Sequence, residues 1–166
     1  MRDLVAFPVL LLSVLLQSAV VSQVYLLAGF ADLTLVVVIA WALQDGVRTA
    51  WHWAIVASAM TAFISGVPWA AIFAGNLLAV LLAQVLQRRV WQAPFLAMFV
   101  VTFFSAILSQ MFAYFALSLI GAPLPFRESF GLVVLPSVLL SLLAGIPVYL
   151  IVRDIARWVY PSEEVE

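Results

Sequence analysis

The sequence contains no cysteine, a single histidine and few charged residues, which make up 9% of the chain. Without cysteine there can be no disulfide, thiolate metal site or thiol nucleophile. His52 lies between two tryptophans with no acid beside it, so we expect neither a metal site nor a hydrolytic triad. The net charge is −1 and no basic stripe suited to nucleic acid is present. We therefore predict that the protein is not an enzyme and uses no metal, cofactor or nucleic acid.

Apolar residues are abundant instead, at 67% of the 166 residues, and the mean hydropathy is +1.22. Soluble domains are about half apolar and about a quarter charged. A chain this small cannot bury such an excess in its own core, so the solvent for most of it must be the lipid bilayer. We expect one membrane domain over residues 1–160 and a short acidic tail over 161–166.

Hydropathy and the breakers between apolar runs divide the chain into six segments. They are approximately Leu4–Leu26, Asp32–Leu43, Trp51–Ile64, Pro68–Leu86, Pro94–Leu119 and Leu132–Val152. A spanning helix needs roughly 20 apolar residues, so we predict an all-α integral membrane protein with six transmembrane helices. The first segment is longer than the apolar part of a signal peptide and is expected to be a retained helix. The second and third are short, and are either extended by their flanks or sheltered within the bundle.

The arginines predict the orientation of these helices. If both termini are cytoplasmic, six of the seven arginines lie on the cytoplasmic side, which follows the positive-inside tendency. These six are Arg2, Arg48, Arg88, Arg89, Arg153 and Arg157, whereas Arg127 lies outside beside Glu128. The tryptophans expected at cytoplasmic helix ends are Trp41, Trp51, Trp53, Trp91 and Trp158, and Trp69 lies at the outer side.

Small residues recur at every fourth position in several segments, and two such rows concern us. The fourth-segment ridge consists of Ala71, Gly75 and Ala79, and the last-segment ridge consists of Ser137, Ser141 and Gly145. Close backbone approach holds helices together in lipid. These ridges therefore predict either packing inside the bundle or a face that binds a partner helix. In the second case we expect Asp32 and the loop 121–128 to make further contacts on the outer side.

Polar residues within the apolar segments are few. Asp32 begins the second segment, where it can cap a helix, contact a partner or serve as the acid of a pocket. Gln17 and Asn76 need hydrogen-bond partners if buried, and can act as clips between helices or line a small cavity with Asp32. Gly66, Pro68, Pro136 and Pro147 are assigned to structural turns that shape the backbone.

Three stretches resemble the MreD family of bacterial rod shape-determining membrane proteins. The first is Asp32–Val38 with the turn that ends at Asp45-Gly46, the second is Phe63–Pro68, and the third runs from Leu135-Pro136-Ser137 through Pro147 to Arg153. The resemblance implies a non-enzymatic scaffold of the cell-elongation machinery in the bacterial cytoplasmic (inner) membrane. It implies binding to MreC, which has one membrane helix and a periplasmic coiled coil. Through MreC it implies influence on the penicillin-binding transpeptidase and its glycosyltransferase partner in peptidoglycan synthesis.

The same family is similar in fold to the substrate-binding subunits of energy-coupling-factor vitamin transporters, which are six-helix membrane proteins with an outward pocket. That likeness implies an alternative function, a transporter subunit with a pocket around Gln17, Asp32 and Asn76. A vitamin pocket usually has more polar and aromatic groups in its outer loops than the loop 121–128 supplies. The sequence therefore favours the scaffold.

Overall fold

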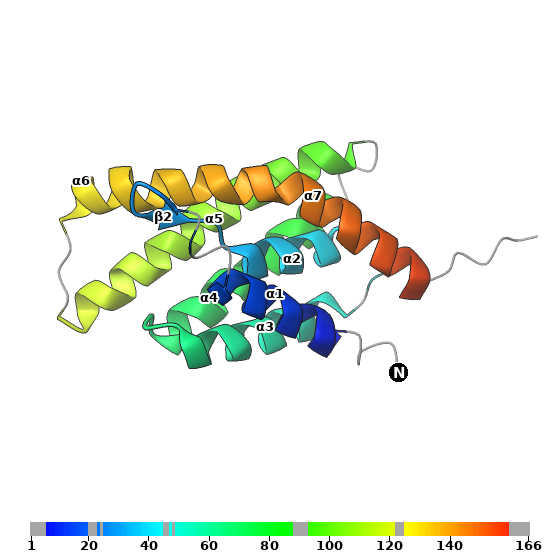
Figure 1. Ribbon diagram of the computed structural model, residues 1–166, viewed down its shortest axis with the longest axis horizontal. Coiled ribbons are helices and arrows are strands. Elements are labelled where there is room, and N and C mark those ends of the chain that lie inside the picture. The colour runs from blue at the N-terminus through cyan, green and yellow to red at the C-terminus, as the bar shows by residue number, and fades with distance from the viewer. Residues whose placement is uncertain are drawn as a thin grey trace, which may run out of the picture.

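The computed structural model describes residues 6–19, 23, 25–44, 47, 49–87, 93–121 and 125–159, and these form six helical rods with one short hairpin (Figure 1). The first five rods are single α-helices, and the sixth is a continuous rod of α6, a π-helical segment η3 and α7. Their bounds are α1 Ala6–Ala19, α2 Leu33–Ala42, α3 Ala50–Ile64, α4 Trp69–Gln87, α5 Pro94–Leu119, α6 Phe126–Ser129, η3 Phe130–Val134 and α7 Leu135–Val159. The predicted all-α fold with six helices is confirmed.

Three of the six rods are long and apolar enough to cross a membrane: α4, α5 and the continuous rod from Phe126 to Val159. They indicate a multi-pass membrane protein. In Figure 1, α1 begins at the same end of the bundle at which α7 ends, and α6 begins at the opposite end. Arg153 and Arg157 thus lie far from Arg127 along the bundle.

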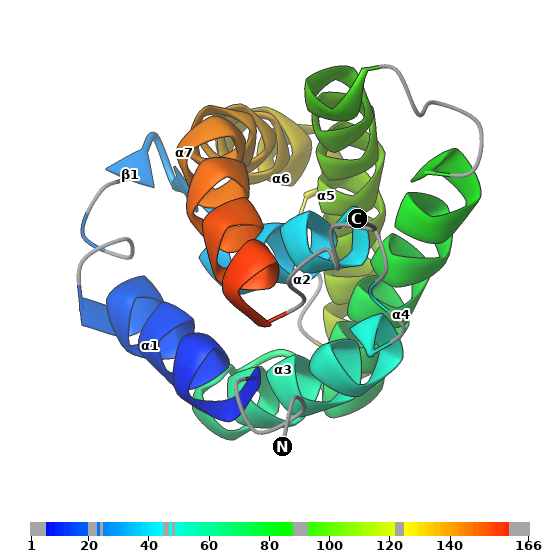
Figure 2. The same cartoon turned by 90° about the vertical axis from the view of Figure 1, so that its right-hand side faces the viewer.

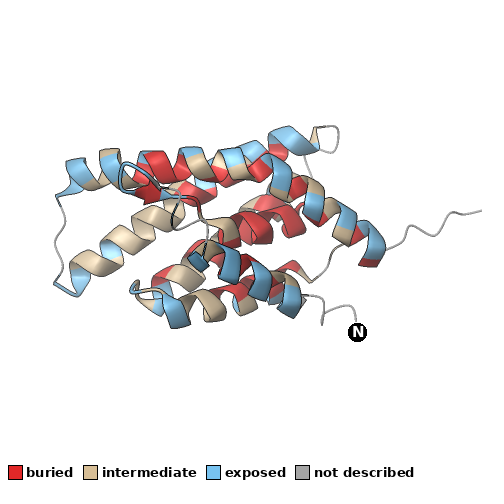
Figure 3. Ribbon diagram, viewed as in Figure 1, coloured by how far each residue is buried: buried red, intermediate tan, exposed pale blue. Residues whose placement is uncertain are grey.

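The short second helix lies in the middle of the bundle. In Figure 2, α2 is surrounded by α1, α3, α4, α5 and α7, and it contacts all five. Nine of its ten residues are buried, as the red surface of its ribbon shows in Figure 3. At about 1.5 Å per residue, α2 is roughly 15 Å long, about half the thickness of the hydrocarbon core. The second predicted segment is therefore a short helix sheltered within the bundle, and its flanks do not extend it to a full span.

The sixth rod is shaped by its two prolines, which lie inside the helix and not in turns. Pro136 has no N–H group, so the carbonyl of Leu132 one turn earlier receives no hydrogen bond from it. The backbone N–H of Ala28 donates to this carbonyl instead, at 3.0 Å. Further along, α7 bends in its orange part near Pro147 (Figure 1), as expected where a proline interrupts the hydrogen-bond ladder.

The strands β1 (Tyr25–Leu26) and β2 (Gly29–Phe30) form a hairpin that packs on the sixth rod. The predicted extension of the first helix to Leu26 was therefore wrong. Hydropathy does not separate an apolar strand from an apolar helix. What fixes the hairpin is remote in sequence: Ala28 donates to Leu132, and the N–H of Phe30 donates to the Ser137 Oγ at 3.2 Å.

Two of the predicted interfacial tryptophans belong to the core. Trp41 and Trp53 are 1% and 0% exposed, and their rings stack at 3.9 Å. Trp41 also donates from Nε1 to Thr49 Oγ1 at 3.2 Å. By contrast, Trp158 and Trp69 are largely exposed at opposite ends of the bundle. The interfacial location predicted for Trp41 and Trp53 was therefore wrong, because both rings lie inside the bundle.

Some predicted features lie outside the described residues or differ from them. Arg2, Arg48, Arg88, Arg89, Trp91, the Asp45-Gly46 turn and the tail 161–166 are outside. Within the loop 121–128, residues 122–124 are also outside, and Phe126, Arg127 and Glu128 begin a helix. This part of the predicted loop is therefore helical.

Candidate functional site: a cavity between the helices

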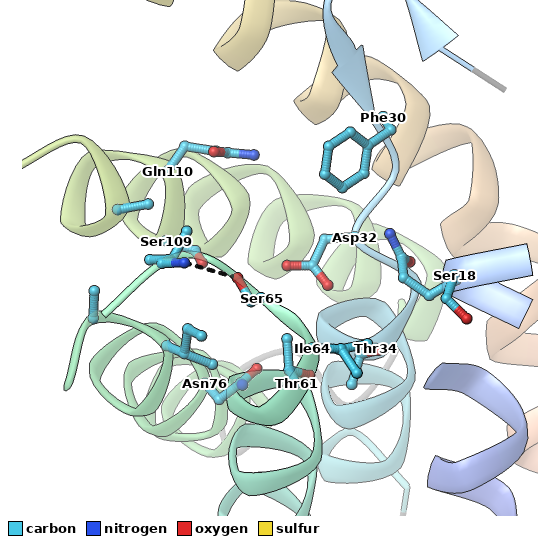
Figure 4. Close-up of a pocket in the computed structure, with 15 residues that line it drawn as sticks. Ser18, Phe30, Asp32, Thr34, Thr61, Ile64, Ser65, Asn76, Ser109 and Gln110 are labelled. Atoms are coloured by element: carbon cyan, nitrogen blue, oxygen red, sulfur yellow. Dashed lines mark hydrogen bonds between the residues drawn. The ribbon is translucent and has the colours of Figure 1, made fainter. Parts of the chain in front are cut away.

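A cavity of about 400 Å³ lies where α1, β2 and the ends of α2, α3 and α4 meet the middle of α5 (Figure 4). Its size is at the lower end of the range typical of small-molecule sites. It brings together Gln17, Asp32 and Asn76, the three residues that the sequence grouped around a pocket. The full lining is Gln17, Ser18, Phe30, Asp32, Thr34, Thr61, Ile64, Ser65, Val67, Ala71, Ile72, Asn76, Ser109, Gln110 and Ala113.

Asp32 joins the hairpin to the central helix. Its side chain caps α2, because Oδ1 accepts a hydrogen bond from the N–H of Leu35 at 3.0 Å. Its own N–H donates to the Ser141 Oγ on α7 at 3.0 Å. The carboxylate points into the cavity in Figure 4. Asp32 is the one charged side chain among the lining residues.

Gln17 clips α1 to the start of α2 with both ends of its amide. Its Nε2 donates to the carbonyl of Ala31 at 2.7 Å, and its Oε1 accepts from the N–H of Leu33 at 2.7 Å. The Leu33 N–H is one of the donors that a helix start leaves without an internal partner. Gln17 therefore positions Asp32 from the other side, and both the nitrogen and the oxygen of its amide are engaged within the protein.

Asn76 clips α4 to α3 but keeps an acceptor. Its Nδ2 donates to the Ser58 Oγ at 2.9 Å, and this hydroxyl donates in turn to the carbonyl of Ala54 at 2.7 Å. The amide oxygen of Asn76 accepts no hydrogen bond from a described residue. Nearby, the Thr61 hydroxyl is buried without a partner among the described residues. Both residues belong to the cavity wall.

Gln110, on the opposite wall, projects from α5 toward the cavity in Figure 4. Its amide makes no hydrogen bond within the described ranges, unlike that of Gln17. The sequence marks Gln110 only as one more amide in an apolar segment, and gives no signal that Phe30 or Thr61 belongs to the same site. Their assembly depends on the hairpin and on the packing of α4 against both α3 and α5.

The two small-residue ridges are covered by the protein's own helices. Every one of the six ridge residues is buried. A Cβ atom on Gly75 would lie 2.8 Å from the Ser109 Oγ of α5, and one on Gly145 would lie 3.7 Å from the Met98 Cε. Ser137 and Ser141 receive the hydrogen bonds of the hairpin and of Asp32. The geometry thus favours internal packing, the first of the two interpretations of these ridges.

The turn between α3 and α4 borders the cavity. The N–H of Ser65 donates to the Thr61 carbonyl at 2.9 Å, and the Ser65 Oγ accepts from the Val67 N–H at 3.1 Å, drawn as a dashed line in Figure 4. Pro68 immediately precedes α4, and its carbonyl accepts from the N–H of Ala71 at 3.0 Å. A Cβ on Gly66 would meet no atom within 4 Å. The turn therefore depends on Ser65 and Pro68 more than on the glycine.

The described residues contain no group of three or more acidic or histidine side chains that could hold a metal ion. No protein-family model, curated protein or solved structure matches the chain. The geometry of the cavity and the bundle therefore provides the evidence for function.

Proposed function

We propose that this protein is a non-enzymatic scaffold of the MreD type, a six-helix protein of the bacterial cytoplasmic membrane that binds MreC and helps to regulate peptidoglycan synthesis. The observation that supports this proposal is the way the resembling residues shape one bundle. Asp32 caps the central helix, Pro68 leads into α4, and Pro136 frees the carbonyl on which the hairpin docks. Contacts that shape the backbone depend on particular residue types. A resemblance at these residues is therefore more specific than a resemblance in apolar composition alone.

The proposed orientation places both termini in the cytoplasm. It is supported by the shared end at which α1 begins and α7 ends, and by Arg153 and Arg157 at that end. Alkaline phosphatase inserted in the α5–α6 connection should be active, whereas a green fluorescent protein after α7 should fluoresce. An inactive phosphatase at that insertion would contradict the orientation.

Binding to MreC is tested by co-purification from membranes. We expect contacts at the outer end of the sixth rod, where Phe126, Arg127 and Glu128 are exposed, since the two ridges are buried. The double variant Arg127→Ala/Glu128→Ala should lower the yield of MreC without lowering the midpoint of thermal unfolding. Asp154→Ala, an exposed change near the opposite end, is the control. Failure of the wild-type chain to retain MreC would refute the scaffold function.

A second candidate, the substrate-binding subunit of a transporter, is favoured by the cavity itself. A cavity of about 400 Å³ that contains one carboxylate and three amide side chains has the size of a small-molecule site. This function predicts co-purification with an ATPase module and a rise in unfolding temperature with a vitamin. Absence of both, with MreC retained, would leave the scaffold as the sole candidate.

A further inference from the structure

We propose that the cavity binds a small organic cation, specifically a primary ammonium group attached to a short apolar body. The site comprises Asp32, Asn76, Gln110, Thr61 and Phe30 from five different elements (Figure 4). The inference holds whether the protein acts as a scaffold or as a transporter subunit, because it concerns binding alone.

The charge of the lining residues determines whether the cavity favours a cationic or an anionic ligand. The lining contains one carboxylate and no arginine or histidine. A carboxylate kept out of water is costly unless a positive charge or hydrogen-bond donors compensate it. The Leu35 N–H occupies Oδ1 of Asp32, and the second oxygen receives no hydrogen bond from the described part of the chain. An ammonium group can supply both the charge and the donor, whereas an anion would be repelled.

The unpaired acceptors around Asp32 suit a group with several N–H donors. The amide oxygen of Asn76, which belongs to the cavity wall, accepts no hydrogen bond from a described residue. Gln110 can rotate its amide to present its oxygen, because none of its own hydrogen bonds holds it in place. A primary ammonium has three N–H donors that can be shared among such acceptors. Buried acceptors that find a partner are far less costly than those that do not.

Size and the apolar wall define the remainder of the ligand. A volume of about 400 Å³ is much larger than the ~30 Å³ occupied by one water molecule, so a bare metal ion would leave the cavity mostly unfilled. Ile64, Val67 and Ile72 form an apolar part of the wall. Phe30 also lines the cavity (Figure 4), and the face of an aromatic ring can attract a cation.

Three probes of one size and different charge test the proposal: benzylammonium, benzyl alcohol and benzoate. Each is titrated into the full-length protein in a nonionic detergent at neutral pH, and binding is measured by isothermal titration calorimetry. We expect saturable 1:1 binding of benzylammonium, at least about tenfold weaker binding of benzyl alcohol, and the weakest binding for benzoate. Equal affinity for the amine and the alcohol, or no saturable binding of the amine, would overturn the proposal.

The variant Asp32→Asn isolates the charge, because asparagine is also a good N-cap and should preserve the start of α2. It should reduce the preference for the amine over the alcohol to about twofold or less, whereas Asp154→Asn, which lies outside the cavity, should retain it. If Asp32→Asn does not fold, Gln110→Leu provides a second test of the site, since it breaks no internal hydrogen bond and should weaken amine binding severalfold. Undiminished amine preference in folded Asp32→Asn, or undiminished amine affinity in folded Gln110→Leu, would refute the assignment of the site.

Discussion

The docking of the hairpin on the sixth rod predicts that Gly29→Ala is destabilising for steric reasons alone. An added Cβ would lie 2.6 Å from the Val133 carbonyl oxygen and 2.7 Å from the Ser137 backbone nitrogen. Both are backbone atoms of one helix and cannot rotate away. Gly29 does not have a positive φ, so alanine is compatible with its backbone conformation. The entire cost of the substitution comes from this contact.

The magnitude follows from the two ways in which the contact can be relieved. If the hairpin stays in place, overpacking costs about 1–3 kcal/mol. If it moves away from α7, it loses the hydrogen bonds from Ala28 to Leu132 and from Phe30 to Ser137, each worth about 0.5–1.5 kcal/mol. Both estimates are similar. For a chain of this length the midpoint of thermal unfolding should fall by roughly 2–12 °C.

Thermal unfolding in detergent measures this effect, with Gly66→Ala as the control because a Cβ there would meet no atom within 4 Å. The control should unfold within about 2 °C of the wild type. Hydrogen exchange adds a local measurement, since the amides of Ala28 and Phe30 should lose protection in Gly29→Ala. Equal unfolding temperatures for Gly29→Ala and Gly66→Ala, with unchanged exchange at both amides, would refute the docking of the hairpin.

Four further substitutions at three positions test the contacts inside the bundle by the same unfolding measurement. Gly75→Leu should prevent folding or lower the midpoint of thermal unfolding by more than roughly 5 °C, because the leucine side chain would enter the space of Ser109 on α5. A wild-type midpoint would contradict the α4–α5 packing. Asp32→Ala should cost about 1 kcal/mol by removing the cap on Leu35, and Asp32→Asn should restore most of it. Asn76→Leu removes the hydrogen bond to Ser58 and should lower the midpoint of thermal unfolding. An unchanged midpoint would show that this hydrogen bond contributes nothing to stability.

The sequence was sufficient to predict the long helices but not the hairpin. The spans that became α3, α4 and α5 were predicted within about two residues, because proline or tryptophan marks the places where apolar runs begin. The first helix was predicted too long, since residues 25–30 are as apolar as a helix. Their conformation depends on Pro136, more than a hundred positions away, which leaves the Leu132 carbonyl without its helical donor.

The candidate site was predictable only in part. Asp32, Gln17 and Asn76 stood out because polar side chains are rare in these apolar segments, and all three lie on the cavity wall. Phe30 and Thr61 are ordinary members of an apolar run and of a helix, so only the folded bundle identifies them. The small-residue ridges gave no indication of which helix covers them, since the same spacing serves internal and external packing equally.

What distinguishes a structural amide from a ligand-binding one in this bundle is how many of its hydrogen bonds the protein itself satisfies. Gln17 uses both its donor and its acceptor between α1 and α2, so replacing it should cost stability and leave probe binding changed only indirectly. Gln110 forms no hydrogen bond within the described ranges and faces the same cavity, so replacing it should change binding and leave stability nearly unaltered. Asn76 has one group of each kind and should affect both properties. If all three amides were purely structural, each substitution would lower stability without a separate effect on probe binding, and that result would contradict a ligand-binding role for Gln110.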